Sequence, residues 1–194
     1  MRKEDIMMGK MIKSSEIKKG MKYKFENMYY ECIEVTYISG FFSRSIGRAK
    51  VIAKRITDGA IVEMTLSPNE LVEEIYFNEN KMIFTYEADE KLYFIDSDTY
   101  DMVEAPISMF KWEKNFLNAN LEVSCLVSGT EMIKINLPDM VCLTINSCDK
   151  IDGSKPFKNA ICETGLKVQV PLFTNAGDDI YVSTVDGTYK GRAN

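Results

Sequence analysis

Short strand-like segments separated by turns recur along most of the chain, and this pattern constrains the fold more than any other feature. The segments are rich in β-branched and aromatic residues, which favour strands, and Gly, Asp or Glu residues mark several of the turns between them. They lie at residues 28–37, 60–66, 81–86, 91–96, 122–127, 132–137, 141–146, 166–170 and 179–184. Many short strands with frequent turns predict an all-β chain built from small barrels or sandwiches.

Three other segments complete the expected organisation. Pro106–Asn115 predicts a single short helix that caps a barrel, residues 1–12 predict a flexible extension, and Cys148–Asn159 predicts an exposed loop. Proline-containing breaks at Ser67–Asn69 and Leu137–Asp139 divide the 194 residues into pieces of about 60 residues each. Barrels of that size bury marginal cores alone, so we expect each to dock against a neighbour.

The composition argues against several classes of protein. The longest apolar runs fall far short of the roughly 20 residues of a membrane span, and the start of the chain has no apolar signal-peptide core, so a cytoplasmic chain is expected. The chain has no histidine, which removes the usual general base and every Ser-His or Cys-His nucleophile. The five cysteines have no metal-type spacing and predict reduced, buried thiols. We therefore expect no enzyme, no metal and no cofactor.

Positive charge concentrates in the first part of the chain. Residues 1–72 hold 13 Lys and Arg against 9 Asp and Glu, a net charge of +4, whereas residues 73–194 carry −9. Within the first part, residues 39–50 combine small residues with cations between two strand-like segments, and further cations follow on the next strand. The cations singled out for contact with RNA phosphates are Arg44, Arg48, Lys50, Lys54 and Arg55.

Five separate segments carry a resemblance to the bacterial elongation factor P family, which extends from about Ser14 to Ala193. Glu16–Gly20 resembles the family's opening strand and turn, and Thr57–Ala60 its Thr-Gly turn. Tyr93–Tyr100 resembles its Tyr-Val-Phe-Met-Asp-x-x-Thr-Tyr segment, Lys158–Pro171 its C-terminal signature, and Thr188–Ala193 its closing Tyr-x-x-Arg. Together these segments are specific, whereas none would suffice alone.

The resemblance implies three small β-barrel domains in tandem, arranged in an L shape like a tRNA. A KOW/SH3-like N-terminal domain is expected over residues 13–74, a central OB-fold over 75–138 and a C-terminal OB-fold over 139–194.

The resemblance also implies a translation elongation factor that binds the 70S ribosome between the P and E sites. There it would contact the peptidyl-tRNA in the P site and stimulate peptide-bond formation when consecutive prolines stall synthesis. The family's loop-tip residue falls on Arg44 without a gap; a second register would place Arg48 at the tip but requires unequal changes in the two arms of the loop, so Arg44 is preferred. Tyr189 and Arg192 are carried over as further RNA contacts, and a monomer is expected.

Several positions depart from the family pattern. Ser43 and Ser45 replace the glycines that commonly flank the tip, and the loop at residues 149–157 is shorter than usual. Thr174 stands where an aliphatic residue is usual. Arginine at the tip is typical of the arginine subclass, rhamnosylated in some members, or of the elongation-factor-P-like paralogue; in the first case an arginine-modifying enzyme would be a further partner.

Two other readings compete with this one. The chain could be a generic OB or SH3-like barrel module that binds RNA or protein outside the ribosome, and aromatic residues could then form stacking platforms for single strands, although core packing is the favoured role for most of them. These aromatics are Tyr29, Tyr30, Phe77, Phe84, Tyr86, Tyr93 and Phe94. The carboxylates Asp96, Asp98 and Asp101 could belong to an enzyme, but their position on a turn favours capping.

Overall fold

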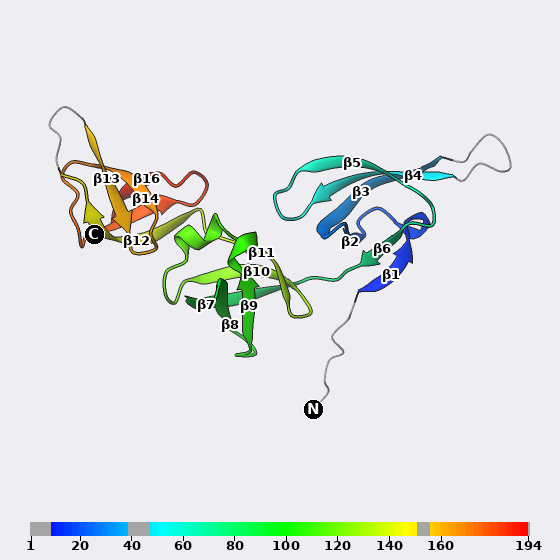
Figure 1. Ribbon diagram of the computed structural model, residues 1–194, viewed down its shortest axis with the longest axis horizontal. Helices are drawn as coiled ribbons and strands as arrows, with labels where there is room; N and C mark the ends of the chain where they lie inside the picture. Colours follow the sequence, from blue (N-terminus) through cyan, green and yellow to red (C-terminus); the bar gives the residue numbers. More distant parts are fainter. Residues whose placement is uncertain (1–8, 39–46, 151–155, 194) are drawn as a thin grey trace. The chain divides into compact units, whose positions relative to one another are not determined.

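Three sheets contain all the strands that the structure describes. The computed structural model describes residues 9–38, 47–150 and 156–193 (Figure 1). The strand orders are β1-β6-β2-β3-β4-β5, β11-β10-β7-β8-β9 and β14-β13-β12-β15-β16. The strands are β1 (Lys10–Lys13), β2 (Lys22–Phe25), β3 (Met28–Ile38), β4 (Arg48–Arg55), β5 (Ile61–Leu66), β6 (Leu71–Glu74), β7 (Asn78–Ala88), β8 (Lys91–Asp96), β9 (Met102–Pro106), β10 (Glu122–Ser128), β11 (Glu131–Asn136), β12 (Met140–Cys148), β13 (Phe157–Cys162), β14 (Lys167–Pro171), β15 (Asp179–Ser183) and β16 (Tyr189–Arg192).

The strands of the three sheets follow one another along the chain, which confirms the prediction of an all-β protein with three β domains. The expected boundaries at residues 74 and 138 stay predictions. By contacts, the chain divides into two compact units, one of Met1–Asn78 with Val127–Lys134 and the other of Glu79–Leu126 with Ile135–Asn194. Among the described residues, no helix has the length and apolar character needed to cross a membrane.

The first sheet buries one face of its strands and exposes the other. In β4 the small residues Ala49, Val51 and Ala53 are buried, and the residues between them are exposed or half-buried. Side chains of a strand alternate between its two faces, so this spacing places the small residues in the core beside Tyr23 and Val72. The outward face of β4 therefore carries Arg48, Lys50 and Lys54, together with the half-buried Ile52.

The tip of the β10–β11 hairpin, which belongs to the first unit, contacts β2 and β3 through a small polar network. The Tyr29 hydroxyl donates a hydrogen bond to the Glu131 carboxylate, and the Lys24 ammonium lies 3.2 Å from Glu131 Oε2. Lys24 also lies over the Tyr29 ring, 5.0 Å from its centroid. The ring of Tyr29 is almost completely buried, so its hydroxyl requires a partner, and Glu131 supplies one.

The expected helix over Pro106–Asn115 is wrong: this segment contains 3₁₀ turns instead. They are η2 (Ile107–Met109) and η3 (Glu113–Phe116), separated by residues 110–112, where Phe110 has φ −125° and ψ 40°. A third, η1 (Ser14–Glu16), lies in the first unit. A segment this short gains little from helix formation alone, so tertiary contacts decide its conformation. Here the Trp112 Nε1–H donates to the Thr184 carbonyl at 2.8 Å, and Phe116 is fully buried in the core of the third sheet.

Two predictions of irregular structure are also corrected. The flexible extension expected over residues 1–12 does not hold for Lys10–Ile12, which lie in β1, where Ile12 is buried and pairs with Val72. The exposed loop expected over Cys148–Asn159 is shorter, because β12 includes Cys148 and β13 begins at Phe157. Each missed strand end has few buried side chains, which leaves little alternation for the sequence to reveal.

We predict that Phe116→Ala strongly destabilises the protein. Phe116 has no exposed surface and belongs to the same core cluster as Leu143, Ile145 and Ile180. Truncating a buried phenylalanine typically costs about 3–5 kcal/mol in the free energy of unfolding, measurable by urea denaturation. Phe173→Ala is the matched control, since Phe173 is 64% exposed. Equal denaturation midpoints for the two variants would contradict this role of Phe116.

A second stability prediction concerns Thr174, which is fully buried while its hydroxyl finds no hydrogen-bond partner among the described residues. An unsatisfied buried hydroxyl is costly, so we expect Thr174→Val to raise the free energy of unfolding by about 1 kcal/mol. Thr174→Ser keeps the hydroxyl and loses only a methyl group, so it should bring no gain. Thermal unfolding of both variants checks this, and a lower melting temperature for Thr174→Val would refute it.

Candidate nucleic-acid interface

The candidate interface begins with the two strands that flank the predicted loop. β3 and β4 are antiparallel, and their last described pair is Ile38 with Arg48. Arg48 is thus the first residue of β4 and directly follows the segment between the two strands, and the choice between Arg44 and Arg48 as the tip residue stays a prediction. Arg44 belongs to the segment between the two strands, and it lies outside the described residues.

Three predicted cations share the outward face of β4. Arg48, Lys50 and Lys54 alternate with the buried Ala49, Val51 and Ala53, so all three point away from the core. Successive residues on one face of a strand are about 6.6–6.8 Å apart, so Arg48 and Lys50 are neighbours on this face, whereas Ile52 lies between Lys50 and Lys54. The Lys50 ammonium lies 3.0 Å from Glu63 Oε1 on the neighbouring β5.

Arg55 has different surroundings from the other three cations. Its Nε and Nη2 donate to the two carboxylate oxygens of Asp58 at 2.8 and 2.5 Å. Asp58 Oδ1 also accepts a hydrogen bond from the Ala60 N–H at 3.1 Å. The hydrogen bonds from Arg55 and from the Ala60 backbone lower the pKa of Asp58 to about 2. These contacts hold the turn between β4 and β5, and contact of Arg55 with RNA stays a prediction.

Tyr189 and Arg192 lie on β16 in the third sheet, apart from the β4 cations in sequence and in sheet. Tyr189 is half-buried and packs against the core of that sheet. Arg192 Nη2 lies 2.7 Å from Asp178 Oδ1, and the Asp178 side chain is mostly buried. The structure thus brings together Arg48, Lys50 and Lys54 but gives Tyr189 and Arg192 structural contacts of their own.

The aromatic residues divide between core and surface. Tyr29, Phe84 and Phe94 are buried, which confirms the favoured packing role for these three. Tyr86 and Tyr93 stack on each other with ring centroids 4.6 Å apart, and Tyr86 remains exposed. A stacked and partly exposed pair is a surface feature that the strand pattern alone did not distinguish from core.

The carboxylates considered for an enzyme form a capped turn. Asp96 is buried, and its Oδ1 accepts hydrogen bonds from the Asp98 and Thr99 N–H groups at 2.9 and 3.0 Å. Its Oδ2 accepts a hydrogen bond from Asn80 Nδ2 at 2.6 Å. Burial raises the pKa of Asp96, but these hydrogen bonds outweigh it, so the pKa lies below its ordinary value. The capping role that the turn predicted is confirmed for Asp96.

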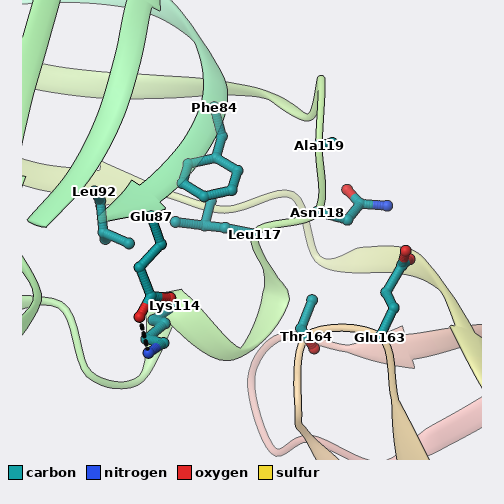
Figure 2. A pocket seen from close by; sticks show the side chains of 9 residues that line it. All are labelled: Phe84, Glu87, Leu92, Lys114, Leu117, Asn118, Ala119, Glu163 and Thr164. Carbon is teal, nitrogen blue, oxygen red and sulfur yellow. Dashed lines mark hydrogen bonds and ion pairs between the residues drawn. The ribbon is translucent and has the colours of Figure 1, made fainter. Parts of the chain in front are cut away.

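A hollow of about 240 Å³ in the second unit was not predicted from the sequence (Figure 2). On one side of it, Lys114 and Glu87 point toward each other and form an ion pair of 2.5 Å. On the other side, the Thr164 hydroxyl donates to the Asn115 carbonyl at 2.6 Å, and Glu163 accepts a hydrogen bond from the Thr144 N–H. These polar groups thus already have partners within the protein, which suits a structural junction. No single sequence motif could reveal it, since its walls come from distant segments.

The five cysteines are free thiols, as predicted, but not all of them are buried. Cys32, Cys125 and Cys162 are buried, whereas Cys142 is exposed and Cys148 is half-buried. Burial raises the pKa of the Cys125 thiol to about 12 and that of Cys162 to about 11. Within the part of the chain that the structure describes, no cluster of three or more carboxylates and thiols has the geometry to hold a metal ion.

Comparison with known proteins gives consistent matches along the chain. A family model described as the elongation factor P OB domain matches residues 77–135, and one described as elongation factor P, C-terminal, matches residues 142–192. Elongation factor P of Mesoplasma florum is 32% identical over 183 residues, covering 92% of this chain and 98% of that protein. Elongation factor P of Mycoplasma mycoides is 32% identical over 185 residues, with coverages of 92% and 98%.

Among solved structures, a eukaryotic translation initiation factor 5A from Methanococcus jannaschii is similar to part of the chain. It is 17% identical, with a TM-score of 0.41, and the match covers 68% of this chain and 95% of that one.

We predict a pH-dependent effect of Asp58→Asn on stability. A carboxyl with a lowered pKa in the folded state stabilises the protein above its unfolded pKa of about 3.9, and this contribution is lost as the pH falls toward about 2. Wild type should therefore be more stable than the variant at pH 6, and the difference should vanish near pH 2. Urea denaturation across this range measures it; a difference that stays constant with pH would contradict the assignment. Because the pair is largely exposed, added salt should reduce the difference.

Proposed function

This chain belongs to the elongation factor P family, and on that premise we propose that it binds the ribosome between the P and E sites and stimulates peptide-bond formation on peptidyl-tRNA stalled by consecutive prolines. Family membership by itself gives the chain a role in translation. The finer proposal is supported by one observation above all: three cations lie on the outward face of the strand that leads directly from the segment containing Arg44.

Consecutive prolines slow peptide-bond formation for a geometric reason. The proline ring fixes φ and makes the attacking nitrogen a hindered nucleophile, while prolines already in the nascent chain restrict where the ester carbon can lie. Holding two reactants in a productive orientation can supply a large part of a reaction barrier without any acid or base. A factor that steadies the 3′ end of the peptidyl-tRNA would therefore restore the rate.

In this proposal the β3–β4 arms hold Arg44 toward the CCA end of the tRNA. Arginine carries a permanent charge on a planar fork of five donors, which can bind phosphate or ribose oxygens. Arg48, Lys50 and Lys54 would contact backbone phosphates, which positions the factor without reading sequence. Because the core side of β4 is buried, these charges are carried on a strand with little freedom to shift.

The proposal requires no chemical step by the protein itself. With no histidine in the chain, orientation and charge are the contributions that its residues are suited to make. The partners in this proposal are the 70S ribosome and the P-site peptidyl-tRNA, met by a monomeric protein in the cytoplasm. Where Arg44 is modified, an arginine-modifying enzyme is a further partner.

The test is the rate of peptide-bond formation in a reconstituted translation reaction with a Pro-Pro-containing template. Arg44→Ala should lose most of the stimulation, by about tenfold or more, because small losses of positioning can cost up to roughly 100-fold in rate. Arg44→Lys keeps the charge but not the fork, so it should keep part of the activity. Lys167→Ala, an exposed cation on β14, is the control and should behave as wild type.

A combined Arg48→Ala, Lys50→Ala, Lys54→Ala variant separates binding from orientation. It should bind ribosomes more weakly and with a smaller dependence on salt, because fewer phosphate contacts release fewer counterions. At saturating concentration it should still stimulate the reaction, unlike Arg44→Ala. If Arg44→Ala stimulated the reaction as strongly as the wild-type protein, the proposed role of Arg44 at the CCA end would be contradicted. Absence of ribosome binding by the wild-type protein would instead favour a barrel module that acts elsewhere.

A further inference from the structure

The first unit contains a second group of cations, which line a hollow formed by other segments than β4. It has a volume of about 470 Å³ and is formed by the turn before β2 together with the end of β6 and the residues that follow it. Its lining residues are Lys18, Lys19, Gly20, Met21, Lys22, Glu74, Ile75, Tyr76 and Phe77. The volume falls within the roughly 300–1,000 Å³ of small-ligand sites.

The charges of this hollow favour an anion. The lining contains three lysines, Lys18, Lys19 and Lys22, and one carboxylate, that of Glu74. The neighbouring Glu74 carboxylate raises the pKa of the Tyr76 hydroxyl. Lys18 and Lys19 are exposed. The net charge of the lining is positive, which attracts phosphate groups in particular.

The same hollow contains two aromatic rings. Tyr76 is 49% exposed, and the Lys22 ammonium lies over the Phe77 ring, 4.9 Å from its centroid. Aromatic faces stack on nucleobases of any sequence, and cations beside them hold the phosphates of the same strand. Gly20 forms part of the wall with φ +81°, and a Cβ built there would meet nothing within 4 Å, so the space next to the backbone is open.

From these contacts we propose that the hollow binds an unpaired nucleotide of RNA. The lysines hold its phosphate, and the base stacks on Tyr76 or Phe77. The register of the first sheet separates this hollow from the start of β4. Lys22 lies on β2 and pairs with Glu31 near the start of β3, whereas Arg48 of β4 pairs with Ile38 at the far end of β3. The hollow is thus a second RNA contact; it rests on the proposed function only in that ribosomal or transfer RNA would supply the nucleotide.

The alternative occupant is an acidic peptide, which the lysines would also attract. The aromatic rings favour RNA, because carboxylates gain nothing from an exposed ring face, whereas a base gains a stacking surface. The lining also offers few groups that could read base edges, so binding should be largely independent of sequence.

The proposal is tested on the full chain with a fluorescently labelled 12-nucleotide single-stranded RNA of mixed sequence. Ultraviolet cross-linking followed by peptide mapping should place the cross-link at Tyr76 or Phe77. Tyr76→Ala should weaken binding by about tenfold, and Lys19→Ala with Lys22→Ala should lower the slope of log binding constant against log salt by about 1.4, for two phosphate contacts with single-stranded RNA.

Matched controls come from other parts of the chain. Tyr100→Ala removes a tyrosine that is 80% exposed in the second unit, and Lys167→Ala removes an exposed lysine; both should bind as wild type. The proposal would be overturned if the Tyr76 and lysine variants bound RNA like these controls, or if the cross-links mapped elsewhere. It would also be overturned if polyglutamate displaced the RNA while Tyr76→Ala had no effect on binding.

The same experiment distinguishes this proposal from the proposed function. Arg44→Ala should keep the cross-link at Tyr76 while it loses stimulation of peptide-bond formation. If the wild-type protein cross-links at Tyr76 but does not stimulate the reaction, RNA binding by the hollow is supported and the proposed function is contradicted. Stimulation of the reaction without a cross-link at Tyr76 would support the proposed function and contradict RNA binding by the hollow.

Discussion

The register between β3 and β4 is the constraint on which the candidate interface depends. After the irregularity between Cys32 and Glu34, the pairing continues unbroken to Ile38 and Arg48. A shift of one residue would turn the β4 cations into the core and the small residues Ala49, Val51 and Ala53 toward solvent. Burying unpaired charges is far more costly than exposing alanine and valine. The burial of three small side chains therefore fixes the direction of the charges and the position where the arms of the loop begin.

Packing across sheets adds buried side chains to small cores. The third sheet obtains a fully buried aromatic from outside its own strands, since Phe116 comes from η3. The first sheet gains the β10–β11 hairpin tip, where Glu131 satisfies the buried Tyr29 hydroxyl. Small barrels bury a low fraction of their surface, so side chains contributed by neighbours have a large share in their cores. Segments that connect strands of the second sheet thus also pack against the first and third sheets.

The sequence predicted those elements that show regular alternation over many residues, such as β3, β5 and the hairpin strands β7 and β8. It failed where tertiary contacts decide, as in η2 and η3, whose conformation follows the burial of Phe116 rather than local preference. Among the candidate site residues, alternation alone predicts that the three β4 cations share one outward face. The pairing of Arg55 with Asp58 does not, because a cation three residues before a carboxylate on a turn reads equally well as two solvated charges.

That pairing matters for how the first unit could attract RNA. A cation held by two short hydrogen bonds must give up its carboxylate before it can bind a phosphate, so Arg55 adds less to binding than its charge implies. The outward cations of β4 and the lysines beside Gly20 lie on separate parts of one sheet, and both belong to the part of the sequence with net charge +4. The remaining residues carry −9 and would repel phosphates. In the proposed function, the charge distribution therefore favours RNA contact through the first unit, and the sheet then decides which cations are presented.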